Sequence, residues 1–182
     1  ILPLLFFVSQ ASEKTAPTKE QVNTIQAIKI AFSDRSYTLL FFGFFVCGFH
    51  VQFIGTHLPA YIIDEGLAPI IGAWSLALIG LFNIAGSFFA GWSGQIYSKP
   101  KLLAAIYASR AAVIALFIFT PLSGTSVLVF SAAMGILWLS TVPLTTGLIA
   151  QTQGLKFLST LAGLVFFSHQ VGGFLGAWLG GR

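Results

Sequence analysis

Five stretches of mostly apolar residues follow one another along the sequence, and each reaches the length of about 20 residues that a membrane-spanning helix needs. They are residues 38–62, 70–94, 102–121, 127–149 and 157–179. Because the connectors between them are short, consecutive helices must be antiparallel. A closed β-barrel also satisfies every backbone group in lipid, but it requires alternating segments of about ten residues, which this pattern lacks. The sequence therefore predicts an all-α integral membrane protein.

The scarcity of charge supports the same fold. Only 8% of the 182 residues are charged, whereas a soluble domain has about 25%. The lipid bilayer is therefore the expected partner. The nine Lys and Arg residues form no basic face of the kind that binds nucleic acid. The single cysteine, Cys47, excludes a disulfide framework or a CxxC metal motif, and we interpret it as a small packing residue.

The first 36 residues differ from the rest of the chain. Residues 1–8 are apolar but too short to span a membrane, and they are typical of the end of a truncated transmembrane helix, with a signal peptide as the alternative. Residues 9–36 are polar, and Thr18 in this segment is placed to cap a helix. The apolar residues of that helix would be Val22, Ile25, Ile28 and Phe32. An amphipathic helix on the membrane surface and a solvated linker helix both fit this pattern.

The distribution of Lys and Arg predicts an orientation. The 9–36 segment carries four of them, the connector 98–101 two and the connector 151–156 one, while the connectors 64–66 and 121–126 carry none. Basic loops remain on the cytoplasmic side of a membrane. We therefore expect a multi-pass protein of the inner, cytoplasmic membrane in which 9–36 is a cytoplasmic loop and 64–66 faces outward.

Two features shape the predicted spans. Gly172, Gly176 and Gly180 repeat every four residues in the last span, which permits close helix contact, either for static packing or for sliding of one helix on another. Pro143 lies in the fourth span and lacks a backbone N–H, so a kinked or locally unwound helix is expected there. Thr141 lies beside this interruption. Broken helices of this kind hold solutes in several transporters, although many membrane prolines only shape packing.

Four ionisable residues lie at membrane depth, namely His50, His57, Arg110 and His169. Such residues are candidates for function, because burying charge in lipid is costly. Arg110 lies about 12 Å into a core roughly 30 Å thick, and no predicted span contains an acidic residue. Its expected partner is an anionic solute, unless its side chain extends to the cytoplasmic surface. His50 and His169 are candidates for solute contact or proton coupling, the alternative being neutral rings bonded to carbonyls.

Three stretches resemble bacterial major facilitator superfamily (MFS) transporters of the monocarboxylate and oxalate/formate type. Residues 43–61 resemble helix seven, 138–144 resemble helix ten and 169–182 resemble helix eleven. The resemblance implies that the chain is a fragment holding helices seven to eleven, with residues 1–8 as the end of helix six. It also implies a missing N-terminal half of six helices as a partner. The implied function is alternating-access transport of a small solute such as a monocarboxylate, with or without a coupling proton.

The resemblance has limits. Oxalate carriers place an arginine in helix eight and a lysine in helix eleven, where this chain offers only Asn83 and His169, so oxalate is not supported as the solute. Gln95 replaces the acidic residue of the family's usual motif between helices eight and nine. No catalytic residue, cofactor or metal site is expected. An enzyme would need clustered ligands or acids, a channel would need a filter segment or ring of charges, and a non-transporting scaffold or sensor is the remaining alternative.

Overall fold

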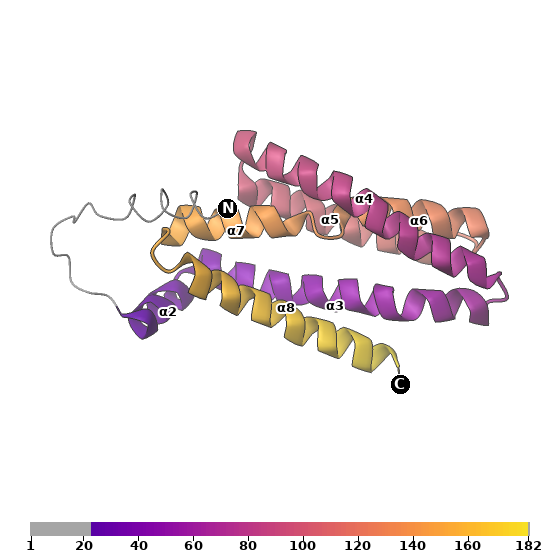
Figure 1. Ribbon diagram of the computed structural model, residues 1–182, viewed down its shortest axis with the longest axis horizontal. Helices are drawn as coiled ribbons and strands as arrows, with labels where there is room; N and C mark the ends of the chain where they lie inside the picture. The colour runs from indigo at the N-terminus through magenta and orange to yellow at the C-terminus, as the bar shows by residue number, and fades with distance from the viewer. Residues whose placement is uncertain (1–22, 182) are drawn as a thin grey trace, which may run out of the picture.

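The computed structural model describes residues 23–181, which are helical apart from short connectors (Figure 1). The expected helix end at residues 1–8, together with Thr18 and Val22, lies outside the described residues. The described helices are α2 (Thr24–Ser33), α3 (Arg35–Asp64), α4 (Pro69–Ile96), α5 (Lys99–Phe119), α6 (Gly124–Leu137), α7 (Thr141–Gln153) and α8 (Leu158–Gly180).

Five helical units in this part of the chain are long and apolar enough to cross a membrane. They are α3, α4, α5, the consecutive pair α6 and α7, and α8. Each overlaps one of the five predicted spans, so the all-α membrane fold is confirmed. Successive units run in opposite directions, and the connector from α3 to α4 lies at the other end of the bundle from the connector between α7 and α8 (Figure 1).

The helix α2 packs at one end of the bundle. Asn23 caps it by accepting a hydrogen bond from the Gln26 N–H, while the Gln26 side chain accepts one from the Asn23 N–H. Its buried residues are Ala27 and Ala31, whereas Ile25 is exposed. Ile28 packs against the same core as Ala31, and the Phe32 ring contacts Tyr37 and Phe41 on α3. Of the predicted apolar row, Ile25 is thus the described member that lies away from the core.

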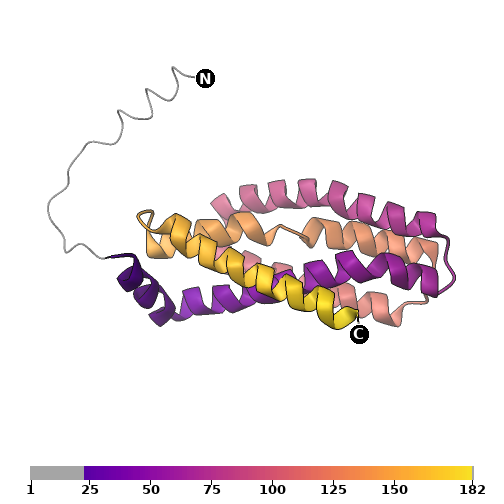
Figure 2. The same cartoon turned by 60° about the horizontal axis from the view of Figure 1, so that its bottom comes forward.

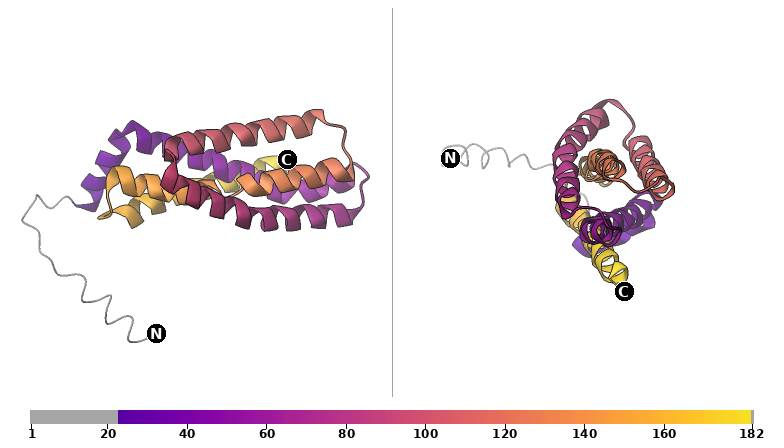
Figure 3. Two further views of the ribbon diagram at one scale, coloured as in Figure 1. Left: turned by 90° about the horizontal axis from the view of Figure 1, so that it is seen from above. Right: turned by 90° about the vertical axis from the view of Figure 1, so that its right-hand side faces the viewer.

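The pair α6 and α7 occupies the interior of the bundle. The end-on view in Figure 3 shows it surrounded by other helices, and contacts with α4 and α5 hold it on two sides. The helix α8 lies along α3, as Figures 1 and 2 show from two directions. This α3–α8 pair has the most extensive interface between helices among the described residues.

Glycines allow the backbones of α3 and α8 to touch. A methyl group added to Gly48 would overlap the backbone carbonyl of His169, and one added to Gly172 would overlap that of Phe45. Gly176 meets α3 in the same way one turn further along. Gly180 instead lies against the side-chain ring of His57. Because most of these neighbours are backbone atoms, larger side chains at the first three glycines would force the helices apart.

The fourth spanning unit is interrupted. The helix α6 ends at Leu137 and α7 begins at Thr141, so residues 138–140 are not helical. Pro143 is the third residue of α7. The first four N–H groups of a helix have no acceptor within it, so a proline at that place removes no helical hydrogen bond. The interruption therefore lies just before the proline and leaves the carbonyl groups at the end of α6 in need of partners.

Candidate functional site

The interruption between α6 and α7 is held by a cation from α5. The Arg110 Nη2 donates hydrogen bonds to the carbonyl oxygen of Leu137 at 2.5 Å and to that of Trp138 at 2.9 Å. These carbonyls lie at the carboxyl end of α6, where the helix dipole is negative. A positive charge is therefore favoured at this position, and the guanidinium group satisfies two backbone groups that would otherwise be buried without partners.

A second side chain bonds the same interruption from α4. The Leu139 N–H donates to the Asn83 Oδ1 at 3.0 Å, and the Ser87 hydroxyl donates to the same oxygen at 3.3 Å. The Ser140 hydroxyl donates to the carbonyl of Ile136 one turn back. The helix break thus forms without orphaned backbone groups at these positions, and Asn83 contacts the chain's own backbone through its carbonyl oxygen.

Arg110 is fully buried, with only 1% of its surface exposed. Its guanidinium group does not extend to the cytoplasmic surface, because it is engaged by the end of α6 in the bundle interior. All five acidic residues of the sequence are at or before Glu65, and no spanning helix contains one within its apolar interior. The Tyr107 ring, one turn earlier on α5, lies 5.7 Å from the guanidinium carbon. The charge is therefore buried without a carboxylate.

Cys47 on α3 is the residue that the sequence analysis missed. The Arg110 Nη1 donates to its sulfur at 3.1 Å, and the Thr141 hydroxyl lies 3.5 Å from the same sulfur. Cys47 is completely buried, and it is the point at which α3, α5 and α7 meet. A signal was present in the sequence, because Cys47 is three residues before His50 and so shares a helix face with it.

The histidines have different surroundings. His50 lies within the electrostatic influence of Arg110, and its Nδ1 has no hydrogen-bond partner. His169 lies beside Cys47, and its Nε2 also has none. In contrast, the His57 Nε2 bonds to the carbonyl oxygen of Ala177 on α8 at 3.0 Å. His57 is thus hydrogen-bonded to a neighbouring helix, whereas His50 and His169 each have a ring nitrogen without a hydrogen-bond partner near Arg110 and Cys47.

Buried polar atoms without partners gather around this centre. Within the described residues they are His50 Nδ1, Arg110 Nε, Thr145 Oγ1 and His169 Nε2. Thr145 lies one turn beyond Thr141 on α7 and is completely buried. Native structures leave few buried polar groups unpaired, so this group of atoms is a candidate place for a polar molecule or water to bind. The structure brings together four predicted candidates around Cys47, namely Arg110, Thr141, His169 and His50. The fifth, Asn83, bonds the helix break from α4.

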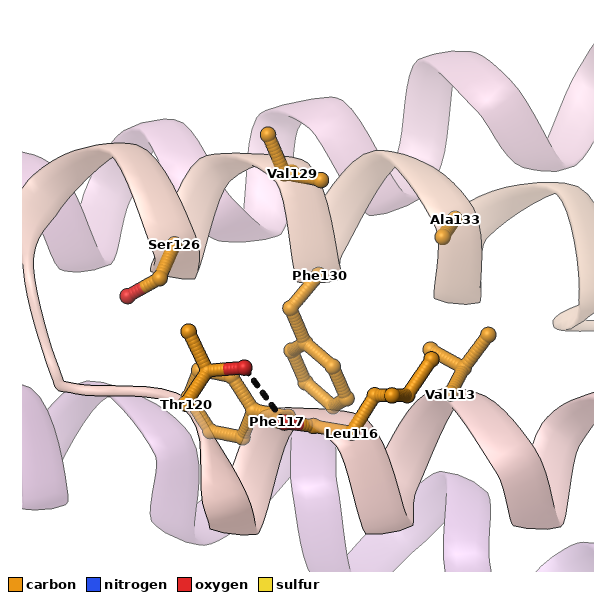
Figure 4. Close-up of a pocket in the computed structure, with 8 residues that line it drawn as sticks. All are labelled: Val113, Leu116, Phe117, Thr120, Ser126, Val129, Phe130 and Ala133. Atoms are coloured by element: carbon orange, nitrogen blue, oxygen red, sulfur yellow. Dashed lines mark hydrogen bonds between the residues drawn. The ribbon is translucent and has the colours of Figure 1, made fainter.

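Two cavities lie between the helices. One, of about 180 Å³, lies between α5 and α6 and is lined mainly by apolar side chains such as Phe117 and Phe130 (Figure 4). The Thr120 hydroxyl at its edge donates to the carbonyl of Leu116 in its own helix. The other, of about 430 Å³, lies between α3, α5 and α7, and its wall includes Tyr107. Of these two cavities, the second approaches the Arg110 centre, because Tyr107 lines it and the Tyr107 ring centroid lies 5.7 Å from the guanidinium carbon.

Long apolar helices around an interrupted one, with a buried cation at the interruption, define a multi-pass membrane protein. A family model for the Major Facilitator Superfamily matches residues 1–177, and the chain therefore belongs to this superfamily.

Two curated proteins are similar to the chain. The "Uncharacterized MFS-type transporter YcxA" of Bacillus subtilis (strain 168) is 25% identical over 193 aligned residues, which cover 100% of this chain and 46% of that protein. "Monocarboxylate transporter 13" of Rattus norvegicus is 28% identical over 136 residues, which cover 74% of this chain and 31% of that protein. The chain thus spans less than half the length of these relatives, and both are named as transporters and not as enzymes.

Proposed function

We propose that the protein is a secondary transporter that carries a small organic anion, such as a monocarboxylate, across the cytoplasmic membrane by alternating access. In this proposal the described helices act together with an N-terminal half of six helices. The superfamily membership supports transport in general. The name of the rat relative supports carboxylates as the first class of solute to test.

The buried charge of Arg110 is the observation that carries the proposal. Placing an arginine at the centre of a membrane helix costs roughly 2.5–3.5 kcal/mol on insertion scales, and the apolar interiors of the spanning helices offer no carboxylate to offset that cost. A guanidinium group has five N–H donors, and three are used by Cys47, Leu137 and Trp138. The Nε, which lacks a partner, is among those that remain. A solute carboxylate would supply a carboxylate partner for the guanidinium group and an acceptor for the unpaired Nε.

The neighbouring residues complete the proposed site. Thr141 and Thr145 lie on α7 directly after the helix break, and His50 and His169 present free ring nitrogens from α3 and α8. We assign to them the contacts with polar groups of the solute. Asn83 acts as a positioning residue, because its carbonyl oxygen bonds the break itself. Since a helix break bends more easily than a continuous helix, the site can change shape as the bundle moves.

Transport by the full-length protein in proteoliposomes tests the proposal. We expect Arg110→Gln to reduce the uptake of small carboxylates by about one to two orders of magnitude, because loss of a charge-assisted interaction with a buried group costs about 1.5–3 kcal/mol and the neutral solute site no longer attracts an anion. Arg110→Lys should restore part of the uptake, since an ammonium group keeps the charge without the planar fork. Uptake of carboxylates by Arg110→Gln at the wild-type rate would contradict the proposal.

Arg110 also bonds the helix break, so the variant needs a control for folding. Thermal unfolding of Arg110→Gln beside the wild-type protein provides it. Unfolding of the wild-type protein with and without a panel of small carboxylates then tests solute binding independently of the variant. A solute that binds the folded state raises the unfolding temperature by mass action. Failure of every carboxylate to stabilise the wild-type protein, together with no flux in vesicles, would instead favour a non-transporting scaffold or sensor on the same fold.

A further inference from the structure

We propose that Cys47 is the proton-carrying group of this site. In the solute-free protein its thiolate is the counter-ion of Arg110, and when an anionic solute binds to Arg110 the thiolate takes up one proton. This inference rests on the proposed transport of an anion, and it identifies the group that couples such transport to protons.

The contact between the two residues is direct and enclosed. The Arg110 Nη1 lies 3.1 Å from the Cys47 sulfur, Arg110 is 1% exposed and Cys47 is 0% exposed. An arginine stays protonated under all ordinary conditions. A buried charge is tolerated when it is paired, and the Cys47 sulfur, which forms an anion when it loses its proton, is within contact of this one. The Thr141 hydroxyl, 3.5 Å from the sulfur, is placed to donate a further hydrogen bond to it.

The titratable groups around the sulfur are few. The helix α5 contributes Arg110 and Tyr107, α8 contributes His169, and α3 itself contributes His50 one turn further on. The sequences of α4, α6 and α7 contain no titratable side chain. His169 lies beside the sulfur with its Nε2 unpaired, so it is placed to pass a proton to or from the thiol. No carboxylate is present in this group to act in place of Cys47.

The proposed cycle balances in atoms and charge. In the empty site the Cys47 thiolate and the Arg110 guanidinium form a neutral pair. When a monoanion binds to Arg110, the sulfur gains one proton and an S–H bond forms, so the site stays neutral with the solute inside. Release of the solute on the other side of the membrane returns the proton from the thiol. No oxidation or reduction occurs, and one proton crosses with each monoanion.

Proton uptake on solute binding is the decisive measurement. It uses the full-length protein in a background where every other cysteine is replaced by serine, with a carboxylate that stabilises the wild-type fold as the probe. We expect one proton to be taken up per carboxylate bound, together with loss of the ultraviolet absorbance of the thiolate. In vesicles, a pH gradient should drive about tenfold accumulation per pH unit, the equivalent of about 1.4 kcal/mol.

The variants separate Cys47 from its neighbours. Cys47→Ser should abolish proton uptake and gradient-driven accumulation, and Cys47→Asp, which keeps a titratable anion, should restore part of both. Proton uptake that persists in Cys47→Ser but disappears in His169→Gln would overturn the inference. If Cys47→Ser does not fold, an unchanged thiolate absorbance in the wild-type protein on addition of the carboxylate overturns it equally.

Two further outcomes keep this inference distinct from the proposed function. If Arg110→Gln loses carboxylate transport while Cys47→Ser retains full proton coupling, the anion site stands and Cys47 is not the proton carrier. If no carboxylate binds to the wild-type protein, the proposed function and this inference both fall.

Discussion

The close contact between α3 and α8 predicts that alanine substitutions at two glycines of α8 change the stability of the protein in opposite directions. Gly172 lies where an added methyl group would overlap the backbone carbonyl of Phe45, with the Phe49 nitrogen also within 3.1 Å. Gly163, also on α8, has no atom within 4 Å of the place where its methyl group would lie. The substitution to alanine is therefore chemically identical at both sites and differs only in the space available.

The two effects can be estimated separately. Glycine destabilises the middle of a helix by roughly 0.5–1 kcal/mol relative to alanine, so Gly163→Ala should stabilise the protein by up to about that amount. At Gly172 the same gain is offset by overpacking, which typically costs about 1–3 kcal/mol. Because the obstructing atoms belong to the backbone, no side chain can rotate away, and α3 and α8 must separate. We expect a net loss of about 1–2 kcal/mol for Gly172→Ala.

The assay is thermal unfolding of the purified full-length protein in detergent. The measured quantity is the fraction of protein that remains monodisperse after heating. Gly172→Ala should unfold a few degrees below the wild-type protein, and Gly163→Ala at or slightly above it. Should Gly172→Ala prove as stable as Gly163→Ala, the backbone contact between α3 and α8 would be looser than described, and the argument from the added methyl group would fail.

Two further predictions concern orientation and the helix break. In a cysteine-free background, Glu65→Cys should react with an impermeant thiol reagent added outside intact cells and Ser98→Cys should not, because Lys and Arg mark the Ser98 side as cytoplasmic; the reverse labelling pattern would refute the orientation. Asn83→Ala should destabilise the protein by about 1–3 kcal/mol, because it leaves the Leu139 N–H buried without an acceptor. Ser87→Ala, which keeps that acceptor, should cost less in the same thermal assay, and equal losses would count against the role of Asn83.

The sequence by itself determined the helical membrane fold. Each of the five apolar stretches became one spanning unit, because a segment in lipid must satisfy its own backbone, and that requirement is local to the segment. The boundaries moved by a few residues. The first span begins at Arg35 and not at residue 38, since the Asp34 side chain accepts a hydrogen bond from the Ser36 N–H and caps the helix there. Local capping of this kind extends a helix beyond its apolar core.

The sequence also indicated which residues to examine, but not what they touch. The absence of acidic residues from the spans made Arg110 conspicuous, and Pro143 marked the helix that is interrupted. Both are properties of one segment, and both can be recognised without knowing the neighbours of that segment. The carbonyl partners of Arg110 carry no signal in the sequence, because every residue has a backbone carbonyl and only an interrupted helix leaves some of them free.

Only the tertiary structure decided the composition of the site. Cys47 precedes Arg110 by 63 residues and Trp138 follows it by 28, yet all three meet in the bundle interior. In a membrane, helices associate through close packing, and the α3–α8 contact depends on which small residues face each other. That matching is a property of pairs of distant segments. Hydropathy acts on each segment alone, so it predicts where helices lie, while packing between helices decides that a buried cysteine contacts a buried arginine.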